Sequence, residues 1–311
     1  MTAATAHVPV MVHEVLAALE VKPGGRYVDC TLGGGGHAEA ILERSQPGGT
    51  LIGIDADASA IERSQRRLAR FEGSFRLVEE NFRNVGEICR KMQFVPVNGL
   101  LMDLGLSSDQ LATGAGFSFQ RDVPLDMRFG GQGATAAEIV NTYGEEELAD
   151  LIYRYGEEPA SRRIARRIVA ARPIRTSGEL AKAVEQAVGR RAHLKTHPAT
   201  RTFQALRIAV NTELEALATA LPQAHGLLGF GARIAVLSYH SLEDRVVKDY
   251  FRRESRGCIC PPELPECRCG HKATLRLVTR GAVKPSLSEV TANPRARSAR
   301  LRAAERIEPT A

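Results

Sequence analysis

The residues best suited to hold a ligand lie at two places near the start of the chain. Four consecutive glycines, Gly33–Gly36, follow a short apolar run that ends near Asp29, and a second apolar run ends in Asp55. Glycines allow positive φ angles and let a ligand approach main-chain N–H groups. Asp55 follows Gly35 by about 20 residues, the spacing at which the second strand of a βαβ unit presents a carboxylate to ribose hydroxyls. The sequence therefore predicts a site for a ligand with an adenosine-like ribose.

The glycines alone do not define that ligand. Gly33, Gly35 and Ala38 satisfy the pattern G-x-G-x-x-G/A, so a dinucleotide is one candidate. A glycine-rich segment is also found as a simple strand-to-helix turn, and it is Asp55 that favours a bound nucleotide here. The choice between a dinucleotide and another adenosine-containing ligand depends on residues further along the chain.

Alternating strands and helices must position these residues. The hydrophobic pattern predicts strands at 26–30, 50–55, 75–78 and 99–103 and helices at 38–45, 59–71 and 84–92. Such alternation is typical of a parallel sheet with right-handed crossovers, and ligands bind beyond the carboxyl ends of its strands. The side chains expected along this edge are Asp29, Asp55, the turn 80–82 and Asp103.

The pattern changes after Asp103. Residues 112–134 are rich in Gly and Phe and predict an ordered loop, and helical periodicity then extends to about residue 220, with one helix over 200–221. Strand character returns at 233–239, 275–279 and 298–302. We expect one α/β domain, residues 1–111 and 217–311, interrupted by an all-helical insertion at residues 112–216.

Composition is that of a soluble globular protein. Of 311 residues, 43% are hydrophobic and 25% are charged. No apolar run reaches transmembrane length, and residues 1–12 lack the basic region and apolar core of a signal peptide. We therefore expect a cytoplasmic protein that does not act at a membrane. The formal net charge of +6 favours a polyanionic partner.

Positive charge is concentrated in the predicted insertion. Between residues 160 and 207 there are twelve Lys and Arg residues and only two acids. At about 100° per residue, the arginines at 162, 163, 166 and 167 share one helix face, and Ile164 and Ile168 lie on the opposite face. A solvated helix face is the usual explanation of such a run. Because the local excess exceeds that of the whole chain, we expect contacts with a phosphate backbone instead.

Nine local sequences, in order along the chain, resemble one family. They lie at residues 7–10, 31–37, 101–108, 116–119, 124–128, 155–158, 197–207, 238–245 and 293–298. Together they cover nearly the whole chain, which closely resembles the bacterial 16S ribosomal RNA cytosine-N4 methyltransferases of the MraW type. The resemblance implies a Rossmann-like class I S-adenosylmethionine-dependent methyltransferase fold with an inserted all-helical domain for substrate recognition.

The resemblance also implies the reaction and the partners. The methyl donor would be S-adenosyl-L-methionine, and the acceptor would be a cytidine in the decoding centre of 16S rRNA, cytidine 1402. The small ribosomal subunit is then the partner, and a homodimer is compatible with the resemblance.

Seven residues are implied as donor-binding by the same resemblance: Gly35, Gly36, His37, Asp55, Phe82, Asp103 and Gln110. Backbone N–H groups at 35–37 suit the methionine carboxylate because they open a helix. Asp55 would accept hydrogen bonds from both ribose hydroxyls, and Phe82 would lie against adenine. Asp103 and Gln110 are expected near the methionine amine or the target base.

Asp103 is the predicted catalytic residue. A hydrogen-bond acceptor at N4–H would localise the lone pair that the cytosine ring delocalises, and would hold the nitrogen in line with the methyl group. Amino-methyltransferases that act on DNA use a D/N/S-P-P-aromatic strand tip for this, whereas this sequence has Asp103 followed by Leu-Gly-Leu. We hypothesise that Asp103 contacts the donor amine or N4, with His240 or Ser241 as a second contact.

Two further groups of residues each allow two interpretations. Phe117 and Phe119 are either stacking partners for a base that leaves its stack or packing residues of the insertion. Four of the six cysteines form two C-x-C pairs: Cys258, Cys260, Cys267 and Cys269. They either bind a structural Zn²⁺ or remain reduced thiols, because C-x-C is tighter than the usual C-x₂₋₄-C spacing. No metal is assigned to the active site.

Two other functions use parts of the same sequence. An NAD-dependent oxidoreductase would use the glycine turn and Asp55, and would be stabilised by NAD but not by S-adenosylhomocysteine. An RNA-binding assembly factor with a vestigial nucleotide site would bind RNA with a steep salt dependence and transfer no methyl group. The combination of Asp55, Phe82 and Asp103 argues against both.

Overall fold

The computed structural model describes residues 9–105, 115–119, 121–131, 133–189, 197–261, 263–264 and 266–309. The chain divides into two compact units. Residues up to 105 and from 214 onward form the first, and the residues from 106 to 213 form the second. Gln110 lies outside the described residues.

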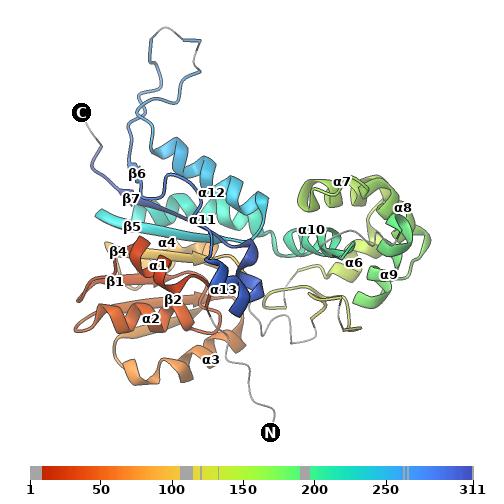
Figure 1. Ribbon diagram of the computed structural model, residues 1–311, viewed down its shortest axis with the longest axis horizontal. Coiled ribbons are helices and arrows are strands. Elements are labelled where there is room, and N and C mark those ends of the chain that lie inside the picture. The colour runs from red at the N-terminus through yellow and green to blue at the C-terminus, as the bar shows by residue number, and fades with distance from the viewer. Residues whose placement is uncertain are drawn as a thin grey trace. The chain divides into compact units, whose positions relative to one another are not determined.

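A seven-stranded sheet forms the centre of the first unit (Figure 1). Its order is β3-β2-β1-β4-β5-β7-β6, with bounds Phe75–Glu79, Thr50–Asp55, Arg26–Asp29, Val97–Asp103, Leu228–Ser238, Arg300–Arg306 and Leu275–Leu277. The pairs from β3 to β5 are parallel, whereas β7 is antiparallel to both of its neighbours. The predicted α/β fold is therefore confirmed, with an antiparallel addition at the end of the sheet.

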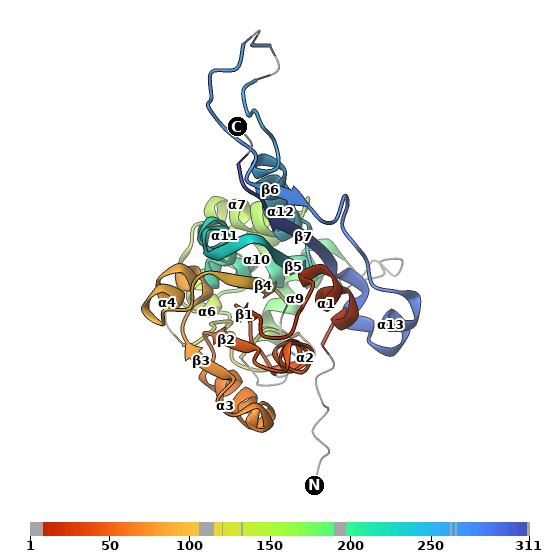
Figure 2. The same ribbon diagram turned by 90° about the vertical axis from the view of Figure 1, so that its left-hand side faces the viewer.

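Helices cover both faces of this sheet (Figures 1 and 2). The helices are α1 Val12–Leu19, α2 Gly36–Ser45, α3 Ala58–Arg67, α4 Val85–Lys91, α11 Glu213–Leu227, α12 Ser241–Glu254 and α13 Leu287–Ala292, with short 3₁₀ turns η1 Ala69–Phe71, η2 Phe82–Asn84 and η3 Pro294–Ser298. One core cluster packs α4, α11 and α12 against the sheet, and the other packs α1 and α2 against its opposite face. Burial of these apolar faces at about 25 cal/mol per Å² is the main force that holds the layers together.

The second unit is helical, as predicted. It contains α6 Ala136–Thr142, α7 Glu145–Gly156, α8 Ser161–Ala170, α9 Ser177–Val188 and α10 Thr200–Asn211 around a separate apolar core. Capping boxes begin two of the helices: Thr135 with Glu138 at α6, and Thr176 with Glu179 at α9.

The prediction of one helix over 200–221 is wrong. The chain forms α10 and then α11, and Thr212 between them has a left-handed φ of 47°. The apolar stripe continues across this break, so hydrophobic periodicity alone did not mark it. None of the helices in the described part of the chain combines the length and the apolar character that a membrane span needs.

Candidate functional site

Strand register brings three carboxylates to one edge of the sheet. Asp29 on β1 is level with Gly53 on β2 and Leu101 on β4. Asp55 and Asp103 lie two residues beyond these partners, at the last positions of β2 and β4. The predicted gathering of Asp29, Asp55 and Asp103 at the carboxyl ends of neighbouring strands therefore matches the structure.

The glycine turn is tied directly to Asp55. Gly33 has a φ of 53° and donates its N–H to Asp55 Oδ2 at 2.8 Å. Gly35 has a φ of 74°, donates its N–H to the Leu32 carbonyl at 2.8 Å, and caps α2. These left-handed angles explain glycine at both positions. The first N–H groups of α2 have no acceptor within the helix, so they remain suited to an anion.

Packing gives a second reason for glycine at position 35 and also accounts for glycine at position 36. A Cβ at Gly35 would lie 2.9 Å from Ser64 Oγ, and one at Gly36 would lie 2.8 Å from Pro9 Cγ. The room beside these α-carbons is therefore filled by the protein itself.

Asp55 is a partly buried acceptor. Its Oδ1 accepts from the N–H of Asp57 at 2.9 Å, and its Oδ2 accepts from that of Gly33. Burial raises the pKa of Asp55, and these two N–H donors partly oppose the rise. Each carboxylate oxygen can accept more than one hydrogen bond, so the Asp55 carboxylate can still accept hydrogen bonds from two hydroxyl groups of a ligand.

Asp103 and His37 face each other near the start of α2. His37 is buried, its Nε2 lies 2.9 Å from the Val10 carbonyl, and its Nδ1 lies 3.5 Å from Asp103 Oδ2. The N–H of Asp103 donates to Thr31 Oγ1 at 2.6 Å. Burial, followed by the nearby charge of Asp103, raises the pKa of Tyr239 well above its usual range. The main chain of Asp103 is therefore held by Thr31, and its carboxylate lies beside His37 and Tyr239.

Asp29 is the least satisfied carboxylate of the edge. Oδ1 accepts from the Thr31 N–H at 3.1 Å, while Oδ2 is buried and has no partner among the described residues. Burial raises the pKa of Asp29 to about 6, the His37 charge and the Thr31 N–H act against this, and Asp103 and Asp55 add to it. The sequence predicted that Asp29 lies at this edge of the sheet. It did not predict that the side chain is buried, because burial depends on both neighbouring strands.

Phe82 and His240 have clear structural roles. Phe82 begins η2 just after β3 and packs against the core that includes α4. His240 caps α12: its Nδ1 accepts from the Glu243 N–H at 3.4 Å, and its Nε2 lies 2.9 Å from Glu243 Oε1. His240 therefore has a structural role at the start of α12, whereas its role as a second contact stays a hypothesis.

The second unit presents the predicted arginine face. The side chains at 162, 163, 166 and 167 on α8 are exposed, and Ile164 and Ile168 are buried. Within this face, Arg166 pairs with Glu145 at 3.3 Å and Arg167 donates to Gln186 at 2.9 Å. Arginines elsewhere in the basic run also bond within the unit. Arg172 donates to the Val140 carbonyl at 2.7 Å, and Arg207 forms two 2.8 Å hydrogen bonds with Glu213.

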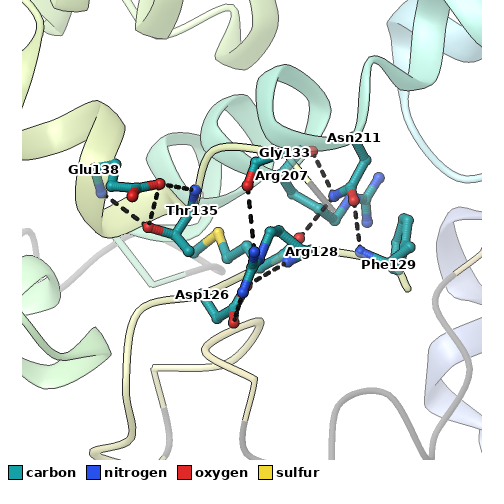
Figure 3. A network of polar contacts seen from close by, with 9 residues as sticks. Asp126, Arg128, Phe129, Gly133, Thr135, Glu138, Arg207 and Asn211 are labelled. Carbon is teal, nitrogen blue, oxygen red and sulfur yellow. Dashed lines mark hydrogen bonds and ion pairs between the residues drawn. The ribbon is translucent and has the colours of Figure 1, made fainter. Parts of the chain in front are cut away.

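A polar network fixes the segment before α6 (Figure 3). Arg128 donates to both carboxylate oxygens of Asp126, at 2.7 and 3.0 Å. Asn211 on α10 accepts from the Phe129 N–H at 2.7 Å and donates to the Met127 carbonyl at 2.7 Å. Met127 is fully buried and has a φ of 64°, a strained conformation for a residue other than glycine. The network on both sides of Met127 holds this conformation.

The two phenylalanines of the preceding loop pack within the same unit. Phe117 stacks on Phe129 at 5.2 Å between ring centroids, and Phe119 stacks on His197 at 4.1 Å. Phe119 also meets Phe203 edge-on at 5.5 Å. These contacts favour the packing interpretation of both rings over a role in stacking on a base.

Comparison with known proteins identifies the family to which this chain belongs. The model of the MraW methylase family matches residues 4–307. The chain belongs to the MraW methylase family. It is 58% identical over 303 residues to "Ribosomal RNA small subunit methyltransferase H" of Dehalococcoides mccartyi, covering 97% of this chain and 86% of the relative. Proteins of the same name from Thermomicrobium roseum and Brevibacillus brevis are 54% and 46% identical over 308 and 307 residues. These alignments cover 97% of this chain and 94% and 98% of the relatives.

This MraW family member has a class I methyltransferase fold. The parallel strands β3 to β5 carry the carboxylate edge, and the antiparallel β7 completes the sheet. The sequence motif S-Y-H-S-L-E-D-R also has a structural explanation, because Asp244 on α12 pairs with Arg302 at 2.6 Å and with Arg300 at 3.1 Å on β7. These two ion pairs connect α12 to strand β7.

Proposed function

We propose that this protein transfers a methyl group from S-adenosylmethionine to N4 of a cytidine in the decoding centre of 16S rRNA, by resemblance cytidine 1402. The observation that carries the proposal is the family match over residues 4–307, together with the carboxylate edge that the sheet presents. The relatives named "Ribosomal RNA small subunit methyltransferase H" support the small subunit as the substrate. Such a substrate would place the reaction in the cytoplasm.

The residues of the carboxylate edge suit this donor. S-adenosylmethionine would supply an electrophilic methyl group when bound. Asp55 would accept hydrogen bonds from the two ribose hydroxyls, in addition to the two backbone N–H groups that already hold it. The backbone N–H groups of Gly36 and His37, at the start of α2, would donate hydrogen bonds to the methionine carboxylate of the donor. Phe82 would contact adenine from its position after β3, and Gln110 remains a donor-binding candidate by resemblance alone.

Asp29 adds a third carboxylate to this edge, and its Oδ2 is buried without a hydrogen-bond partner among the described residues. An unmet buried acceptor costs about 1–3 kcal/mol, so such groups are uncommon in folded proteins. A cationic ligand with an ammonium group and hydroxyls matches an edge of three carboxylates better than an anionic dinucleotide does. This charge argument favours S-adenosylmethionine over NAD.

Asp103 would act on the acceptor base. Its carboxylate would accept a hydrogen bond from N4–H, which localises the nitrogen lone pair and orients it for attack. His37, 3.5 Å from Oδ2, would fix the orientation of the carboxylate. After transfer, the surplus proton on N4 would leave through this hydrogen bond to the Asp103 carboxylate or to water.

The helical unit, residues 112–216 by the sequence boundaries, would recognise the RNA. The arginines at 162, 163, 166 and 167 form an exposed basic face on α8, and α8 is held by the apolar core of its own unit. Arginines on a rigid helix are suited to phosphate contacts that position a strand without reading its sequence.

The test is methylation of purified small ribosomal subunits that lack the modification, with a donor labelled in its methyl group. Nuclease digestion and mass spectrometry would then identify the product. We expect label in N4-methylcytidine at one position of 16S rRNA, and none with large subunits. Label on another base, or no transfer by folded protein to any assembly state of the small subunit, would refute the proposal.

A further inference from the structure

A long excursion of the chain joins α12 to β6. It runs from residue 255 to residue 274 and extends away from the sheet (Figure 1). Its described residues form no helix or strand, and Ile259 and Leu264 are 44% and 45% exposed. Loops of this length without regular structure are uncommon in compact proteins and need a specific source of order.

Four cysteine sulfurs converge inside this excursion. Cys258, Cys260, Cys267 and Cys269 are free thiols, and their Sγ atoms all lie within 4.8 Å of one another. The Sγ atoms of Cys267 and Cys269 are 3.6 Å apart, and those of Cys269 and Cys258 are 3.8 Å apart. With Zn–S bonds of 2.3 Å, the sulfurs of a tetrahedral site are separated by about 3.8 Å. These two separations match that value, and no pair among the four sulfurs is further apart than 4.8 Å.

Backbone amides point at three of these sulfurs. Cys258 Sγ accepts from the Cys260 N–H at 3.4 Å, and Cys260 Sγ accepts from the Arg268 N–H at 3.4 Å. Cys269 Sγ accepts from the N–H groups of Ile259 and His271, both at 3.5 Å. Each half of the loop thus donates to a sulfur of the other half. Amide donors to sulfur stabilise thiolates and orient them as metal ligands.

The C-x-C spacing is no obstacle in this geometry. Within the pair Cys267 and Cys269, the sulfurs reach the separation of two tetrahedral ligands although one residue lies between them. His271 is not a member of the cluster, and its Nε2 lies 3.1 Å from the Arg253 carbonyl. Glu263 and Glu266 are exposed acids of the same excursion and are not members of the cluster.

We propose that Cys258, Cys260, Cys267 and Cys269 bind one structural zinc ion as a closed site of four thiolates. All four positions of a tetrahedral ion are then filled by protein, so the site offers no open position for catalysis. The four thiols release their protons to solvent as the metal binds, and the affinity therefore falls at low pH. The ion connects the two halves of the excursion, which has little apolar core of its own.

The test measures metal content in the full-length protein, purified under reducing conditions without chelator. We expect zinc at about one ion per chain by elemental analysis, and release of that zinc when a mercurial reagent modifies the thiols. Replacement by Co²⁺ should give the intense visible and sulfur-to-cobalt charge-transfer bands of a tetrahedral thiolate site. The double variant Cys258→Ser/Cys269→Ser should lose the metal, while His271→Asn and Glu263→Gln/Glu266→Gln should retain it.

Limited proteolysis separates a local effect from general unfolding. Trypsin should cleave after Arg268 at least about 10-fold faster in the double serine variant, while circular dichroism and the main thermal transition remain. Absence of zinc from reduced protein after reconstitution with excess metal would overturn the proposal. Stoichiometric iron instead of zinc, or full zinc retention by the double serine variant, would also overturn it.

Discussion

Asp29→Asn tests whether the fold retains a buried carboxylate at an energetic cost. Asp29 is 1% exposed, and its Oδ2 has no hydrogen-bond partner in the described part of the chain. Burial raises its pKa from 3.8 to about 6, against the opposing effects of His37 and the Thr31 N–H. Ionisation of Asp29 should therefore destabilise the folded state.

The sign and the size of this effect follow from the two pKa values. The unfolded chain loses the Asp29 proton near pH 3.8, and the folded protein loses it near pH 6. Between these values the folded state binds more protons, so the free energy of unfolding falls as pH rises. At about 1.4 kcal/mol for each pH unit, the fall amounts to about 3 kcal/mol. This contribution to stability is fully present below about pH 4 and is lost by about pH 7.

The assay is urea unfolding of wild type and Asp29→Asn at a series of pH values. Asparagine keeps an oxygen for the Thr31 N–H but carries no charge, so the stability of the variant relative to wild type should rise by about 3 kcal/mol from about pH 4 to about pH 7. Because the new amide NH₂ can add a constant cost, the informative quantity is the change with pH. Asp249→Asn, at a carboxylate with a side chain 62% exposed, is the control and should give a constant difference. A constant difference for Asp29→Asn as well would refute the reasoning.

Three further predictions concern the reaction, the RNA and the fold. Asp103→Asn should lower the methylation rate about 100-fold in single-turnover assays, and unchanged turnover and donor affinity would remove Asp103 from the mechanism. Arg162→Gln/Arg163→Gln should reduce the slope of log K against log salt for RNA binding by about 2. The control Arg66→Gln/Arg90→Gln, in the first unit, should leave this slope unchanged. Equal slopes for wild type and both variants would show that the α8 face does not contact the RNA. Asp244→Ala should lower the free energy of unfolding by about 3 kcal/mol, because it leaves Arg302 without its buried partner, and a loss below about 1 kcal/mol would contradict this role.

The sequence was sufficient to predict the parallel part of the sheet. In β2 and β4 an apolar run ends at an aspartate, and that pattern locates Asp55 and Asp103 at strand ends. It was also sufficient for α8, where exposed arginines and buried isoleucines alternate with helical period. The direction of β7 could not be predicted, because alternation along a strand does not reveal which way its neighbour runs.

Other features depend on residues that are distant in sequence. The need for glycine at 35 and 36 comes partly from Ser64 and Pro9, which no local pattern identifies. The break at Thr212 leaves the apolar stripe intact, so only the backbone reveals it. The unmet oxygen of Asp29 results from burial by neighbouring elements, whereas the sequence shows only an acid after a strand. Local patterns thus predicted the elements, and tertiary packing determined the chemical state of the site.

The most direct test of the donor site is calorimetric titration of S-adenosylhomocysteine into wild type and Asp55→Asn. Loss of a charged acceptor for the ribose hydroxyls should weaken binding by about 10- to 100-fold. Asp57→Asn, which keeps a good cap for α3 in the same turn, should bind like wild type. NAD should produce no binding heat with any of the three proteins. Equal affinity of wild type and Asp55→Asn for S-adenosylhomocysteine, or binding of NAD alone, would contradict the assignment of this sheet edge as the methyl-donor site.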